Sequence, residues 1–118
     1  MIKVAFYNNN DSRELKMTVK GHAGQADVGH DIICASASIL AYTVAQVLKA
    51  MHSHGDLTEE PKIRLNSGDA VVSCRVKEDN NYAEALHTFF VAQVGYSLLA
   101  HNYPNFVELK MFGEAIKP

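Results

Sequence analysis

Residues 31–52 read DIICASASILAYTVAQVLKAMH, and this stretch sets the architecture of the chain. Its apolar residues recur at helical spacing but cover nearly all sides, which is typical of a helix that is buried on more than one side. Asp31 is a good N-cap, because its carboxylate can accept bonds from backbone N–H groups at a helix start. The stretch therefore predicts a helix from Ile32 to about His52, packed on a sheet and also against a partner subunit.

Strand patterns flank this helix on both sides. Upstream, residues 2–8 and 15–19 alternate apolar and polar side chains around a turn cluster, NNNDS, at residues 8–12. Downstream, residues 63–65 and 72–76 alternate in the same way around a turn of sequence NSGD. Each pair of alternating segments predicts a β-hairpin.

A second helix and a last strand complete the pattern. Residues 82–102 carry apolar side chains at helical spacing, and Asn81 followed by Glu84 resembles a capping box. Residues 107–111 alternate again. The order ββαββαβ predicts an α+β fold, a two-layer sandwich of two helices on a mostly antiparallel sheet. With 118 residues and no linker or repeat, we expect residues 1–118 to form a single domain.

Composition and charge narrow the function classes. Apolar residues make up 47% and charged residues 20%, which is ordinary for a globular domain. The net charge is −2, and lysines and arginines are scattered singly, so we expect no direct contact with nucleic acid. The longest apolar run, residues 39–50, is short and interrupted by polar residues, and the first residues do not resemble a signal peptide. We therefore expect a cytoplasmic protein that does not enter a membrane.

Cys34 is a candidate nucleophile. It lies near the start of the predicted helix, twelve residues after His22, which sits in a loop with three glycines at residues 21–29. A helix N-terminus or a nearby imidazolium can lower a thiol pKa from about 8.5 to between about 3.5 and 7.5. A histidine brought beside the thiol could act as general base. Cys74 lies inside an alternating strand and is expected to be an inert core thiol.

Other residues near Cys34 allow more than one role. Ser38 lies one turn beyond Cys34 on the same helix face, where it either permits close packing or contacts a bound peptide. Gly21 and Gly29 suggest a loop that moves over a substrate. His30 could join Cys34 in binding zinc, but the chain lacks the second cysteine pair of a structural zinc site. We therefore expect no metal and no cofactor.

Two short segments resemble the signature of the ribosomal-processing cysteine proteases, the Prp family. That signature is Gly-His-Ala, a short loop, and then Gly-x-Asp-[Ile/Val]-[Ile/Val]-Cys-Ala-x-x-Ser. The matching residues are Gly21-His22-Ala23 and Gly29-His30-Asp31-Ile32-Ile33-Cys34-Ala35-Ser36-Ala37-Ser38. The resemblance is sharp over residues 21–38 and extends to the rest of the chain only through the order of elements.

The resemblance implies a cytoplasmic, homodimeric endopeptidase that needs no cofactor. Its substrate would be a short N-terminal extension of a large-subunit ribosomal protein, the one numbered twenty-seven. Cys34 and His22 would be the catalytic dyad, whereas Asp31 and Ser38 match further family positions. From the residues alone two other classes stay open: a non-catalytic ribosome-assembly or peptide-binding module, and a dimer with a redox-sensing thiol.

Overall fold

The computed structural model describes residues 1–23 and 28–113, with only the backbone for residues 28–31. Its elements are β1 (Ile2–Asn9), β2 (Glu14–Lys20), α1 (Val28–Ser53), β3 (Lys62–Asn66), β4 (Asp69–Arg75), α2 (Asp79–Asn102) and β5 (Val107–Phe112). The predicted order ββαββαβ and the α+β fold are confirmed.

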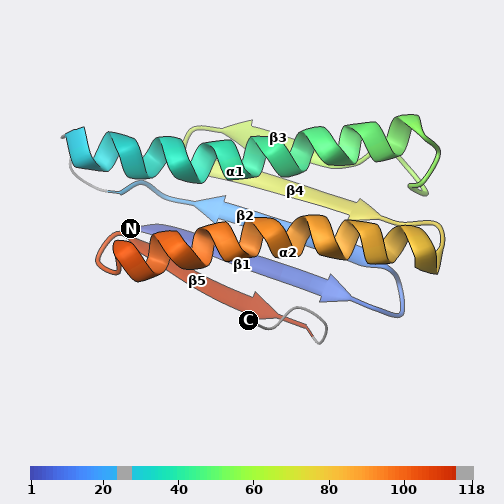
Figure 1. Ribbon diagram of the computed structural model, residues 1–118. Helices are drawn as coiled ribbons and strands as arrows, with labels where there is room; N and C mark the ends of the chain where they lie inside the picture. Colours follow the sequence, from blue (N-terminus) through green and yellow to red (C-terminus); the bar gives the residue numbers. More distant parts are fainter. Residues whose placement is uncertain (24–27, 114–118) are drawn as a thin grey trace.

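The five strands form one sheet in the order β3-β4-β2-β1-β5. All neighbours are antiparallel except β1 and β5, which run parallel. Both helices lie along the same side of the sheet, α1 over β3 and β4 and α2 over β2, β1 and β5 (Figure 1). The molecule therefore has two layers, and no helix among residues 1–23 and 28–113 lies on the other face of the sheet.

The core lies between the helices and the covered face of the sheet. The Phe6 ring on β1 packs 5.9 Å from the Tyr96 ring and 6.3 Å from the Phe89 ring, measured between centroids. The buried Tyr96 hydroxyl donates a hydrogen bond of 2.7 Å to the carbonyl oxygen of Ala37 on α1. This bond ties α2 to the turn of α1 that follows Cys34.

Helix α1 is longer than the sequence analysis predicted, because it begins at Val28 rather than Ile32. Residues 32–53 also have the length and mean hydropathy of a membrane span, contrary to the estimate from the shorter apolar run. A core helix passes the same test, and α1 packs a buried stripe of side chains on the sheet. The stripe consists of Ile33, Ala37, Ala41, Val44, Ala45, Leu48 and Met51.

Helix α2 also begins earlier than predicted. Its N-cap is Glu78, whose side chain makes no capping bond, so the predicted capping box at Asn81 and Glu84 is wrong. Asp79 instead places a negative charge in the first turn, where it interacts favourably with the positive end of the helix dipole. Its carboxylate also forms an ion pair of 3.3 Å with Arg13. An acidic first turn and an ion pair therefore stand at this helix start in place of a side-chain cap.

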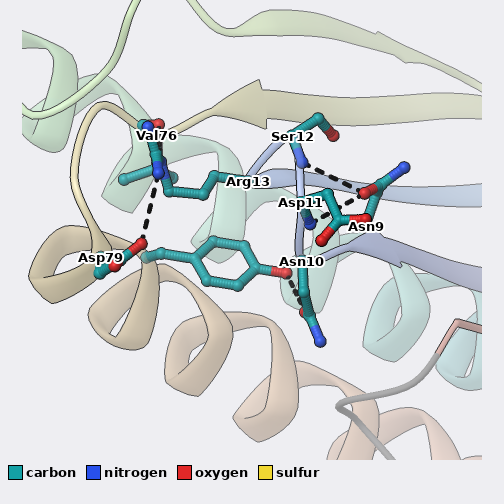
Figure 2. Close-up of polar contacts among 8 residues, drawn as sticks. Asn9, Asn10, Asp11, Ser12, Arg13, Val76 and Asp79 are labelled. Atoms are coloured by element: carbon teal, nitrogen blue, oxygen red, sulfur yellow. Dashed lines mark hydrogen bonds and ion pairs between the residues drawn. The ribbon is translucent and has the colours of Figure 1, made fainter.

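The turn between β1 and β2, residues 9–13, is held by side-chain bonds (Figure 2). Asn9 Oδ1 accepts hydrogen bonds from the backbone N–H groups of Asp11 at 3.0 Å and Ser12 at 3.2 Å. The Tyr82 hydroxyl on α2 donates to Asn10 Oδ1 at 2.6 Å. We call residues 9–13 the distal turn.

Candidate active site

Cys34 lies in the second turn of α1, as the seventh residue of the helix. The sequence analysis placed it in the first turn, with Asp31 as N-cap. Because the helix begins at Val28, Asp31 is a helical residue and the N-cap position falls on residue 27, outside the described residues. The free N–H groups of a helix belong to its first four residues, here 28–31. The helix start therefore acts on the Cys34 thiol over a greater distance than expected.

His22 follows β2 and is anchored through its backbone. Its carbonyl oxygen accepts a hydrogen bond of 2.6 Å from the Met1 nitrogen, and the Gly21 N–H donates to the Gly68 carbonyl oxygen at 2.9 Å. Gly21 has φ +90°, and a Cβ there would overlap the Met1 carbonyl group. Gly21 is therefore required for close packing against Met1. The loop residues 24–27, where we expected movement, lie outside the described residues.

The imidazole of His22 lies over Gly68, in the tight turn that joins β3 to β4. A Cβ on Gly68 would stand 2.7 Å from Cε1 and 3.2 Å from Cδ2 of that ring. Gly68 also has φ +71°, a conformation that side chains other than glycine rarely adopt. The missing side chain at Gly68 therefore makes the space in which the His22 ring sits.

Ion pairs brace the turn beneath His22. Arg64 donates two hydrogen bonds of 3.0 Å to the two carboxylate oxygens of Asp69, and Lys20 pairs with the same carboxylate from β2. The Arg64 guanidinium first, and then the Lys20 ammonium, lower the pKa of Asp69 to about 2. The first residue of β4 is thus fixed to strands on both of its sides.

One cavity brings the predicted residues together. Cys34, Ser38 and His22 all line a cavity of about 90 Å³ between the first half of α1 and the β3–β4 turn. The Cys34 side chain is partly exposed, and those of His22 and Ser38 are exposed. No hydrogen bond joins the thiol to the imidazole among the residues that the structure describes. The cavity thus brings together a thiol, an imidazole and a hydroxyl, open to solvent.

Two predicted supporting residues are described only through their backbone. Asp31 and Gly29 both lie in the first turn of α1, and their side-chain surroundings are outside the described residues. The same holds for His30. Within residues 1–23 and 32–113, no three His, Cys, Asp or Glu side chains gather as metal ligands would.

Sequence reasoning missed the part of the cavity formed by the β3–β4 turn and by Tyr42. The segment NSGD was recognised as a turn, but nothing in its composition places it beside His22. That contact arises because β4 pairs with β2, which sets Asp69 opposite Lys20 at the end of the strand that leads to His22. Tyr42 lies two turns beyond Cys34 on α1 and lines the cavity, and 49% of the residue is exposed.

Comparisons with known proteins identify the group to which this architecture belongs. A family model described as "Cysteine protease Prp" matches residues 1–108. No curated protein shows significant similarity to the sequence.

Solved structures share the fold over nearly all of the chain. SMU.848 from Streptococcus mutans is 25% identical, with a TM-score of 0.67, over 97% of this chain and 96% of its own. The essential ribosomal processing protease Prp from S. aureus, solved with a covalently linked product peptide, is 24% identical, with a TM-score of 0.65 over 94% and 99% of the two chains. A second S. aureus structure, with a substrate peptide, is 23% identical at the same TM-score and coverage.

Proposed function

The chain belongs to the Prp family of cysteine proteases, and we propose that it cleaves its substrate through a dyad of Cys34 and His22. The observation that carries this proposal is the shared cavity, which both side chains line together with Ser38. Membership of a protease family also argues against the two non-catalytic alternatives, the binding module and the redox-sensing dimer.

In the proposed reaction His22 accepts the proton of the Cys34 thiol, and the thiolate attacks the carbonyl carbon of the scissile bond. The tetrahedral oxyanion needs hydrogen-bond donors about 3 Å away. Ser38 is a hydroxyl donor on the cavity wall one turn from Cys34, and we assign it this role. His22 then protonates the leaving amine, and water hydrolyses the thioester. The anchored backbone of His22 and the space above Gly68 hold the imidazole in one place for both proton transfers.

We further propose the substrate: the N-terminal extension of the large-subunit ribosomal protein numbered twenty-seven, cleaved in the cytoplasm. Support comes from the sequence signature and from the S. aureus relative, whose description is a ribosomal processing protease bound to substrate and product peptides. The cavity is small but open, which suits a peptide that enters in extended form and places one carbonyl group at Cys34.

The exposed outer surface of the helices supports a homodimer. Large apolar side chains gather there on both helices, and we call this set the helix patch. Its members are Ile32, Ile39, Tyr42, Val91, Val94 and Leu98. Gly95 brings the helices close, since a Cβ there would stand 2.9 Å from Leu40, so the two halves of the patch form one surface. Exposed apolar patches of this kind mark interaction sites, and we propose that a second copy covers it. Light scattering at micromolar concentration should give twice the mass of the chain, and Ile39→Asp should give the monomer.

The test of the dyad is cleavage of a peptide that spans the extended N-terminus of the ribosomal protein. Cys34→Ala and His22→Ala should each lower kcat/KM by orders of magnitude, because members of a dyad act as a unit. Cys74→Ala is the matched control and should cleave normally. Circular dichroism should show the same fold in all variants. Cleavage retained in Cys34→Ala would refute the nucleophile, whereas cleavage of a scrambled peptide at the same rate would refute only the substrate.

A further inference from the structure

The face of the sheet without helices, which we call the open face, collects basic residues that are far apart in the sequence. Strand alternation directs seven of the chain's 11 lysines and arginines to this face but only three of its 13 acidic residues. The basic residues are Lys3, Lys16, Lys20, Lys62, Arg64, Arg75 and Lys110, and the acidic ones are Glu14, Asp69 and Glu108. The strand residues of the open face thus carry +4, although the whole chain carries −2, and Glu59 and Glu60 before β3 add two negative charges at its edge.

The excess charge lies in the middle of the face. At one end of the strands Asp69 and Glu108 balance the basic residues, and at the other end Arg75 pairs with Glu14. Between these ends no acidic residue of the described strands points to the open face. A band of positive charge therefore crosses the sheet from β3 to β5.

One row of this band combines anion donors with aromatic rings. The strand register places Lys62, Ser73, Lys16, Tyr7 and Phe112 side by side on β3, β4, β2, β1 and β5. With neighbouring strands about 4.8 Å apart, the row spans roughly 19 Å. We call it the lysine–aromatic row.

The two lysines of the row are available for an anion. Among the residues that the structure describes, neither Lys16 nor Lys62 forms an ion pair, although Glu14, which pairs with Arg75, also interacts electrostatically with Lys62. Ser73 lies between the two lysines and offers a hydroxyl. A hollow of about 590 Å³ on this side of the sheet is lined by all three residues and by Arg64 and Arg75, and also by the acidic residues Glu14, Glu59 and Glu60, so that its basic side chains outnumber the acidic ones by four to three. Two ammonium groups and a hydroxyl are the donors with which proteins bind phosphate groups of nucleic acids.

The aromatic end of the row is exposed and stacked. The rings of Tyr7 and Phe112 lie 5.0 Å apart at 10° to each other, and 39% and 49% of the two residues are exposed. The Lys16 ammonium lies 5.4 Å from the centroid of the Tyr7 ring. Exposed rings beside a basic groove are the arrangement on which unpaired bases stack.

We propose that the open face binds single-stranded RNA along the lysine–aromatic row, with phosphates at Lys16, Ser73 and Lys62 and a base stacked at Phe112. An acidic peptide would use the charge but would gain less from the flat faces of the rings, on which a base can stack. The choice of RNA over DNA rests on the proposed ribosomal substrate. Our expectation of no contact with nucleic acid considered only the scatter of basic residues along the sequence, and it did not anticipate that folding gathers them on one face.

The test is fluorescence anisotropy with a labelled mixed-sequence RNA of about 12 nucleotides, at several salt concentrations. Lys16→Ala combined with Lys62→Ala should weaken binding about tenfold and reduce the slope of log K against log salt by about 1.4, since each phosphate contact on a single strand contributes about 0.7. The control is Lys49→Ala combined with Lys77→Ala, which removes the same charge from exposed sites elsewhere and should change neither quantity.

Phe112→Ala should weaken binding about fivefold or more with the salt slope unchanged, and Phe112→Tyr should restore it. Equal weakening by both lysine pairs would overturn the site. If Phe112→Ala bound RNA as tightly as wild type, the proposed base stacking would be wrong, and only a general attraction for polyanions would remain. Tighter binding of DNA of the same sequence would overturn the choice of RNA. Peptide cleavage by all these variants should stay normal, so failure here is distinct from failure of the proposed dyad.

Discussion

Cys34 and Cys74 are the same residue type at opposite ends of the molecule. Cys34 lines a cavity beside the start of β4, partly exposed and next to an anchored histidine. Cys74, near the end of β4, is 7% exposed, and its burial raises the pKa of its thiol to about 12. One is available for chemistry and the other is a core residue. Because the side chains are identical, the difference comes entirely from what the fold places around each.

The two ends of the molecule are also held in different ways. Around Cys34 the packing depends on residues without side chains, Gly21 and Gly68, which let backbone and imidazole approach closely. The opposite end, by contrast, is closed by the distal turn, whose side chains bond to one another and to Tyr82. The end with Cys34 therefore leaves open space beside the thiol, whereas side chains fill the space at the distal end.

Thiol alkylation should give the largest contrast between the two cysteines. In the native protein Cys34 should react with iodoacetamide more than about a hundredfold faster than Cys74, since a buried thiol reacts only when the structure opens. Peptide mapping by mass spectrometry after short exposures measures both rates in one sample. Denaturant should bring the two rates together, and similar rates in the native protein would contradict the contrast.

Substitution at Gly68 should disturb the site end alone. Gly68→Ala places a Cβ against the His22 ring and should lower kcat/KM at least about tenfold, which corresponds to about 1.4 kcal/mol. Gly55→Ala is the matched control, because Gly55 has a similar φ of +81° but no atom within 4 Å of the added Cβ. Both variants should lose some stability, but only Gly68→Ala should lose activity. Equal activities would mean that the His22 ring can move without cost.

Removal of each thiol should separate activity from stability. Cys74→Ala should cost about 1 kcal/mol in the free energy of unfolding, because it leaves a small cavity in the core. Cys34→Ala should change stability by less than half of that, since its thiol is partly exposed and faces a cavity. Urea denaturation followed by circular dichroism measures both values. A larger loss for Cys34→Ala would show that this thiol is a packing residue.

Acid should weaken the site end through Asp69. Its pKa is lowered to about 2 by Arg64 and Lys20, so the ionised form stabilises the folded state. This contribution is fully present above the ordinary pKa near 3.8 and is lost as the pH falls from about 4 to about 2. We expect Asp69→Asn to be less stable than wild type at pH 6 and the difference to shrink toward pH 2. A constant difference over that range would exclude the ion pairs as its cause.

Periodicity predicted the elements well, because the spacing of apolar residues reports directly which sides of a strand or helix are buried. The predicted start of α1 was wrong for a specific reason. An aspartate is favourable both as N-cap and in the first helical turn, so the residue type of Asp31 could not decide between the two. The expectation that Cys34 acts with His22 came from the helix start and the glycine-rich loop, and the family signature supported it.

Features that depend on strand order could not be predicted from the sequence. The turn at Gly68 meets His22, and Lys62 meets Lys16 across Ser73, only because β4 inserts between β3 and β2. Alternation predicts that each strand has a polar side, but it does not say which strands are neighbours. The net charge of a sheet face therefore cannot be read from any local stretch of the sequence.

The parallel pairing of β1 with β5 has a consequence for the order of folding. The backbone of Ile2 donates a hydrogen bond of 2.7 Å to Phe106, about a hundred residues later in the chain, and Ile2 also lines the cavity of Cys34. Contacts between such distant residues form slowly, after local hairpins and helices. During synthesis the first strand must wait for the last before the sheet is complete. We therefore expect a nascent chain to acquire its protease site only when β5 has left the ribosome, which makes cleavage a report of finished folding.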